Sequence, residues 1–91
     1  MLGNEAAIFG ILVVDDHEPN RYTLRTLLTR HLPARVYEAA SGAQALELAL
    51  AQPTAIDLVI LDVQMPDLDG FETATLFRAR HKLRDIPIVF L

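Results

Sequence analysis

The stretch DLVILDVQMPDLDG, residues 57–70, begins as an uninterrupted apolar strand and ends in acidic and turn-forming residues. Leu58 to Leu61 make up the apolar run, and Asp62 follows it directly. A lone carboxylate is costly to bury, so Asp62 should either reach water or have a chemical role. Residues 65–70 contain a proline, two aspartates and a glycine, a composition typical of a loop.

The composition restricts the class of protein. The chain has 91 residues, of which 52% are hydrophobic, so it can form one small globular domain. A net charge of -4 argues against binding to nucleic acid or to an anionic membrane. The chain has no cysteine, which excludes disulfides and thiolate metal sites. Residues 1–14 lack a basic segment, and their apolar run is too short to span a bilayer, so we expect a cytoplasmic domain.

Apolar strands alternate with amphipathic helices along the whole chain. Strands are predicted over residues 8–14, 35–39, 57–61 and 86–91, and helices over residues 19–32, 42–52 and 71–82. We expect Phe71, Phe77 and Phe90 in the core. Strands that alternate with helices predict an α/β protein with a parallel sheet and helices on both of its faces.

Three carboxylates follow the ends of two of these strands. Asp15 and Asp16 end the first apolar strand, and Asp62 ends the third. Ligands of open parallel sheets bind at the carboxyl ends of the strands, so these residues converge if the two strands are neighbours. Mg²⁺ prefers carboxylate, water and phosphate oxygens, and a carboxylate beside it can act as a nucleophile. The simpler alternatives are that Asp62 only reaches solvent and that Asp15 and Asp16 cap a helix.

Four segments together resemble the receiver domain of two-component response regulators. They are LVVDD at 12–16, EAASGAQAL at 38–46, DLVILDVQMPDLDGFE at 57–72 and IPIVFL at 86–91. The resemblance implies a flavodoxin-like, doubly wound parallel sheet with strand order 2-1-3-4. The short PNR at 19–21 is similar to receivers that are fused to hybrid sensor kinases.

The resemblance also implies a role for each acidic residue. Asp62 would be the phosphoacceptor, taking a phosphoryl group from a phosphohistidine on a histidine kinase or a histidine phosphotransfer protein. Asp16 would bind Mg²⁺ directly and Asp15 mainly through water, while Asp62 and the backbone carbonyl of Gln64 would complete the protein ligands. Pro66 and Gly70 would shape the loop after the phosphoacceptor. Such a domain is not a turnover enzyme, apart from autophosphatase activity.

The family pattern extends past the last residue of this sequence. The resemblance implies a Thr or Ser directly after Leu91, then a fifth strand that ends in Lys, and further helices. We therefore expect residues 1–91 to form a receiver domain that is incomplete at its C-terminus, with slow phosphorylation. The strand over 86–91 would lie at an edge of the sheet, so we also expect a homodimer through that strand.

Three functions are consistent with the sequence. The leading one is a phosphorylatable receiver that relays its signal to a partner or a fused output domain. The second is a receiver-fold binding or dimerisation module that has lost phosphoryl switching. The third is a metal-dependent aspartyl phosphatase, which Gln64 disfavours, because the haloacid-dehalogenase type has a second Asp at that position. Phosphorylation of Asp62 separates the first two, and hydrolysis of a phosphate ester would identify the third.

Overall fold

The computed structural model describes residues 8–91. Its elements are β1 (Phe9–Val14), α1 (Glu18–His31), β2 (Ala34–Ala39), α2 (Gly42–Ala51), β3 (Leu58–Leu61), α3 (Gly70–Ala79) and β4 (Ile88–Phe90). The alternation of strands and helices is the predicted one. The absence of a targeting signal was predicted partly on residues 1–7, which lie outside the described residues. No helix within residues 8–91 is long and apolar enough to cross a membrane.

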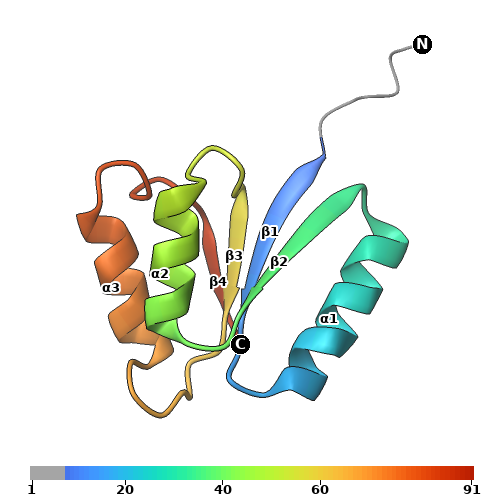
Figure 1. Cartoon of the computed structure of the whole chain (residues 1–91), viewed down its shortest axis with the longest axis horizontal. Coiled ribbons are helices and arrows are strands. Elements are labelled where there is room, and N and C mark those ends of the chain that lie inside the picture. The colour runs from blue at the N-terminus through green and yellow to red at the C-terminus, as the bar shows by residue number, and fades with distance from the viewer. Residues whose placement is uncertain (1–7) are drawn as a thin grey trace.

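The four strands form one parallel sheet in the order β2-β1-β3-β4. Helix α1 covers one face of this sheet, and α2 and α3 cover the other (Figure 1). The doubly wound, flavodoxin-like arrangement with strand order 2-1-3-4 is therefore confirmed. Because β1 and β3 are direct neighbours with Val14 paired to Leu61, the residues that follow these two strands emerge side by side.

The main core lies between the sheet and the pair α2 and α3. Alternate residues of the two central strands point into it, and the largest of them are almost fully buried: Leu12, Val14, Val59 and Leu61. On the opposite face of β1, Ile11 and Val13 are also buried. Burial on both faces explains why the sequence of β1 is apolar without interruption.

Two of the three phenylalanines that we expected in the core are exposed. Phe77 is 0% exposed, whereas Phe71 and Phe90 are 60% and 42% exposed. Helix α3 begins at Gly70, so its buried face passes through Gly70, Thr73 and Phe77 and turns Phe71 outward. The rings of Phe71 and Phe90 contact each other instead, with their centroids 5.0 Å apart.

The connection from α3 to β4 is longer than predicted. The helix ends before the expected residue 82, and the Nη1 atom of Arg78 donates to the backbone oxygens of Arg84 and Ile86, at 2.7 and 2.6 Å. Leu83 and Ile86 are buried in this turn. Strand β4 begins after Pro87, because proline has no N–H with which to extend the strand.

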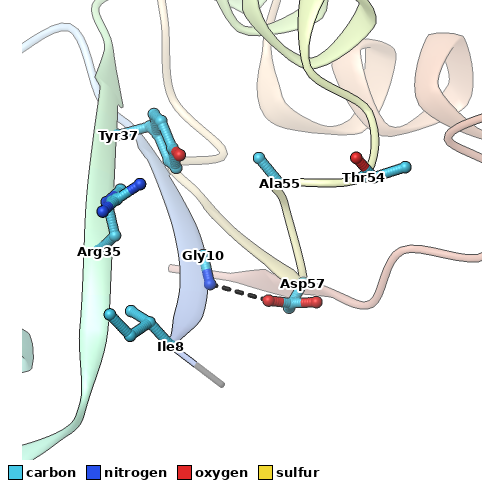
Figure 2. Close-up of a pocket in the computed structure, with 7 residues that line it drawn as sticks. All are labelled: Ile8, Gly10, Arg35, Tyr37, Thr54, Ala55 and Asp57. Carbon is cyan, nitrogen blue, oxygen red and sulfur yellow. Dashed lines mark hydrogen bonds between the residues drawn. The ribbon is translucent and has the colours of Figure 1, made fainter. Parts of the chain in front are cut away.

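At the amino end of the sheet, Asp57 connects the start of β3 to β1. One carboxylate oxygen of Asp57 accepts a hydrogen bond from the Gly10 N–H at 2.8 Å (Figure 2). The Asp57 N–H donates in turn to the Gly10 carbonyl at 2.7 Å. A side chain at position 10 would overlap the carbonyl of Ala55, so only glycine allows this close approach. These contacts fix the register of β1 and β3, on which the geometry at the opposite edge depends.

Candidate metal centre

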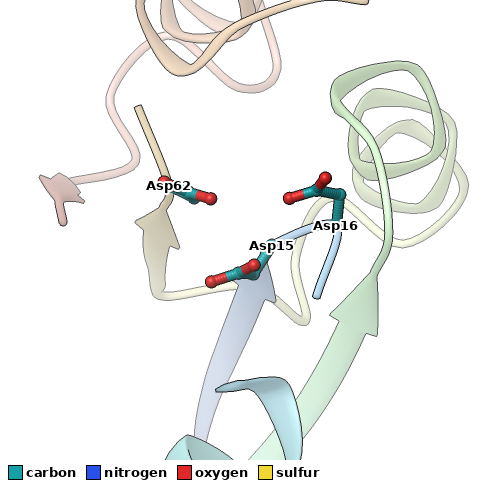
Figure 3. A group of neighbouring side chains, drawn as sticks. All are labelled: Asp15, Asp16 and Asp62. Atoms are coloured by element: carbon teal, nitrogen blue, oxygen red, sulfur yellow. The ribbon is translucent and has the colours of Figure 1, made fainter. Parts of the chain in front are cut away.

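The side chains of Asp15, Asp16 and Asp62 meet at the carboxyl edge of the sheet, where the sequence predicted that they would converge. Each offers one oxygen atom, and these three atoms lie within 4.8 Å of one another. Figure 3 shows the carboxylates of Asp16 and Asp62 extending toward each other, with Asp15 at the end of β1. Asp15 is buried, Asp62 is partly buried and Asp16 is exposed, so the cluster opens to solvent on one side.

Hydrogen bonds fix both the backbone and the carboxylate of Asp15. Its Oδ1 accepts from the N–H of His17 at 2.8 Å, and its Oδ2 accepts from Nδ2 of Asn20 at 3.2 Å. The Asp15 N–H donates to the carbonyl oxygen of Ala39 at 3.1 Å, and the Asp15 carbonyl accepts from Nη1 of Arg21 at 2.7 Å. Neither carboxylate oxygen caps a free N–H inside α1, so the helix-capping alternative does not describe Asp15.

Hydrogen bonds to β1 and to the loop that follows Asp62 fix the position of Asp62. Its N–H donates to the carbonyl of Val14 at 2.9 Å, and its Oδ1 accepts from the N–H of Gln64 at 3.0 Å. Gly70 packs against the Asp62 backbone so closely that an added Cβ would lie 2.8 Å from the Cα of Val63. Position 70 therefore requires glycine, because the neighbouring backbone leaves no space for a Cβ atom.

The other two aspartates of this loop lie apart from the cluster. Asp69 is the N-cap of α3: its Oδ1 accepts from the Glu72 N–H at 2.8 Å, and Glu72 Oε1 accepts from the Asp69 N–H at 3.1 Å. This reciprocal pair is a capping box, and its D-x-x-E spacing is visible in the sequence as a signal that our prediction did not use. Asp67 is exposed. Asp69 thus serves the start of α3, and neither residue belongs to the described carboxylate cluster.

The donor set of the cluster suits a hard cation. It consists of oxygen atoms alone, which favours Mg²⁺ or Ca²⁺ over metals that prefer nitrogen or sulfur. Opposite ligands of Mg²⁺ are about 4.2 Å apart. Oxygens up to 4.8 Å from one another can therefore surround one ion after a small closure, or with a water between the ion and one carboxylate. Beside the cluster lies an open hollow of about 330 Å³, lined by Asp15, Asn20, Thr23, Leu24, Asp62 and Leu91.

Comparison with known proteins identifies the family of this chain. The family model of the response regulator receiver domain matches residues 11–91. The chain belongs to this family. Receiver domains are phosphoacceptors of hybrid sensor kinases and response regulators, and they interact with histidine kinases or phosphotransfer proteins. The family and the fold that the sequence predicted are both confirmed.

The chain spans only part of the length of the relatives that it matches. The virulence sensor protein BvgS of Bordetella pertussis is 48% identical over 69 residues, which cover 76% of this chain and 5% of that protein. The N-terminal domain of a response regulator receiver protein from Methanoculleus marisnigri has a TM-score of 0.85 at 37% identity, over 92% of this chain and 66% of that one. The receiver domain of sensor histidine kinase PA1611 from Pseudomonas aeruginosa, solved with a magnesium ion coordinated in its active site cleft, has a TM-score of 0.82. It is 33% identical over 92% of this chain and 66% of that one.

Proposed function

We propose that this receiver domain accepts a phosphoryl group on Asp62 and passes the signal to a partner or to a fused output domain. The observation that carries the proposal is the position of Asp62 beside Asp15 and Asp16, with oxygens within 4.8 Å. In the step itself, an Asp62 oxygen attacks the phosphorus of a phosphohistidine and forms a P–O bond. The P–N bond breaks, and its electron pair stays on the imidazole nitrogen of the donor. The hydrogen bond from the Gln64 N–H orients the carboxylate before the donor arrives.

The same residues would hold Mg²⁺. Asp16, Asp62 and the backbone carbonyl of Gln64 would bind the ion directly, and Asp15 would bind it mainly through water. When bound, Mg²⁺ would neutralise charge on the oxygens of the transferring phosphoryl group. The all-oxygen donor set supports this assignment, as does the magnesium ion in the related receiver of PA1611.

The donor would be a histidine kinase or a histidine phosphotransfer protein. The phosphoryl group originates from ATP at the kinase, so we place the domain in the cytoplasm. The net charge of -4 gives it no electrostatic attraction for nucleic acid, and we propose no direct contact with DNA or RNA. Transfer to one acceptor group makes the domain a substrate of its kinase rather than a turnover enzyme.

Intact-mass measurement tests the proposal. The chain is incubated with acetyl phosphate and Mg²⁺, alone and after addition of EDTA. We expect the gain of one phosphoryl group that requires Mg²⁺ and disappears in Asp62→Asn. The matched control is Asp67→Asn, which makes the same change of charge at an exposed position of the same loop.

A folded, Mg²⁺-binding chain that stays unphosphorylated would refute this function and favour a binding module with the receiver fold. Phosphorylation that survives in Asp62→Asn would also refute it. Steady hydrolysis of a phosphate ester such as p-nitrophenyl phosphate would instead identify an aspartyl phosphatase.

We also propose that the 91-residue chain, studied alone, forms a homodimer through β4. This strand is the outer member of the described sheet. Val89 in the strand is 47% exposed, and Leu91, directly after it, is 59% exposed. An apolar edge strand pairs readily with a second chain, and a lysine in such a strand prevents the pairing. Light scattering should show a dimer that becomes a monomer in Val89→Lys but not in the control Ala43→Lys, an exposed position on α2. A monomeric wild-type chain would contradict the proposal.

A further inference from the structure

We propose that Arg21 is a positioning residue that fixes the turn of residues 15–17, here called the metal turn. The inference rests on the proposed Mg²⁺ site, because the metal turn carries Asp15 and Asp16. Arg21 lies in the first turns of α1, and its side chain is only 14% exposed. A guanidinium that is buried to this degree requires hydrogen-bond or charge partners, and those partners indicate the role of Arg21.

The guanidinium of Arg21 holds two elements at once. Its Nη1 donates to the backbone carbonyl of Asp15 at 2.7 Å, and its Nε donates to Oε1 of Glu38 on β2 at 3.2 Å. The five N–H groups of arginine are fixed in one plane, so a contact with Glu38 sets the direction of the N–H that reaches Asp15. Strand β2 therefore restrains the metal turn through this guanidinium, in addition to the direct hydrogen bond from the Asp15 N–H to the carbonyl of Ala39.

The contact with the Asp15 carbonyl acts on Asp16. This carbonyl and the Asp16 N–H belong to one planar peptide group, so fixing the oxygen also fixes the plane from which Asp16 starts. Within residues 8–91, no hydrogen bond is formed by the exposed Asp16 carboxylate. Its direction toward Asp62 thus depends on the backbone. Arg21 supplies the restraint that a hydrogen bond to the side chain would otherwise give.

Arg25 is a second arginine of α1 that pairs with Glu38, and its role is structural only. It lies one turn further along α1, pairs with Oε2 of the same Glu38 and lies 5.4 Å from the ring centre of Tyr22. It joins α1 to β2 as Arg21 does, but within residues 8–91 it forms no hydrogen bond with the metal turn. Arg25→Ala is therefore a matched control for the loss of a Glu38 ion pair.

The first experiment measures Mg²⁺ affinity by calorimetry in wild-type, Arg21→Ala, Arg21→Lys and Arg25→Ala chains. Loss of a group that orients metal ligands typically weakens metal binding by about 10- to 100-fold. We expect a loss of at least about tenfold in Arg21→Ala and less than about twofold in Arg25→Ala. Arg21→Lys should be intermediate, because an ammonium group can reach one partner but lacks the planar fork that reaches both. Equal affinities in Arg21→Ala and Arg25→Ala would overturn the inference.

The second experiment needs no metal. The His17 N–H donates to Asp15 Oδ1 inside the metal turn, so its hydrogen exchange in Mg²⁺-free protein reports the order of that turn. We expect exchange about tenfold faster in Arg21→Ala and unchanged exchange in Arg25→Ala. Unchanged exchange in both Arg21 variants would overturn the inference even if the proposed function holds. Failure of the wild-type chain to bind Mg²⁺ would overturn the proposed function, and the His17 comparison would still decide the role of Arg21. If Arg21→Ala does not fold, Arg21→Lys decides both experiments.

Discussion

Replacing Gly70 by alanine should damage phosphoacceptance more than stability. An alanine Cβ would lie 2.8 Å from the Cα of Val63 and would overlap the carbonyl oxygen of Asp62, whereas ordinary contacts begin at 3.4 Å. The obstructing atoms are backbone, so relief requires the Asp62 segment to move by about 0.6 Å or more, and a catalytic group tolerates only about 0.5 Å. Misplacement on this scale reduces reaction rates by about 10- to 100-fold. The cost in stability should be about 1–2 kcal/mol, since overpacking is partly offset by the better helix propensity of alanine.

The assay follows phosphorylation of Asp62 by intact mass, with urea unfolding of the same samples. The matched control is Gly42→Ala. Gly42 is also a buried first residue of a helix, but the nearest atoms to its added Cβ would belong to the side chains of Thr73 and Leu68, not to the backbone. Both variants should lose stability, and only Gly70→Ala should lose phosphorylation. The reasoning is refuted if a folded Gly70→Ala is phosphorylated at the wild-type rate, or if both variants lose the reaction equally.

Three further outcomes are expected. Phe77→Ala should destabilise the chain by about 3–5 kcal/mol in urea unfolding, while Phe71→Ala, at a 60% exposed position, should cost less than about 1 kcal/mol; similar losses would contradict the described core. Asp69→Ala removes the capping box and should lower the free energy of unfolding by about 1 kcal/mol without changing the Mg²⁺ affinity in calorimetry; weaker Mg²⁺ binding would disprove the assignment of Asp69 to the helix cap alone. Mg²⁺ should raise the thermal midpoint of the wild-type chain, reversibly with EDTA, but not that of Asp16→Asn, and an equal rise in both would exclude Asp16 as a ligand.

The sequence predicted the fold because each strong signal had one physical meaning. An uninterrupted apolar run such as residues 11–14 indicates a strand that is covered on both faces, and the alternation of strands and helices indicates a parallel sheet. The position of Asp62 directly after such a strand places it at the carboxyl edge. What joined Asp62 to Asp15 and Asp16 was the adjacency of β1 and β3, which the family resemblance suggested and the structure shows.

The sequence failed where tertiary packing decides between equal local patterns. Phe71 and Phe77 have the same hydrophobicity, but the start of α3 at Gly70 determines which of them faces the core. The end of α3 depends on Arg78, whose contacts with two backbone oxygens cannot be recognised from spacing. The role of Arg21 was likewise not predicted. Its side chain contacts Asp15 and β2, and the sequence separation between these residues does not indicate that they are in contact.

The three carboxylates of the metal centre are restrained by three different parts of the fold. Asp15 is held by hydrogen bonds from the N-cap of α1 and from its first turn. Asp62 is held by the loop that ends at Gly70, and Asp16 through the backbone that Arg21 fixes. At 4.8 Å, the upper limit of the distances between the three oxygens, two unit charges repel by about 1 to 3.5 kcal/mol, depending on the effective dielectric constant. The free energy that opposes this repulsion comes from the core beneath the sheet, because the pairing of β1 with β3 brings the two ends that carry the carboxylates together. A divalent cation would turn the same proximity into attraction without rearrangement of the backbone. The stability of the sheet and the affinity for Mg²⁺ should therefore be thermodynamically linked through these residues.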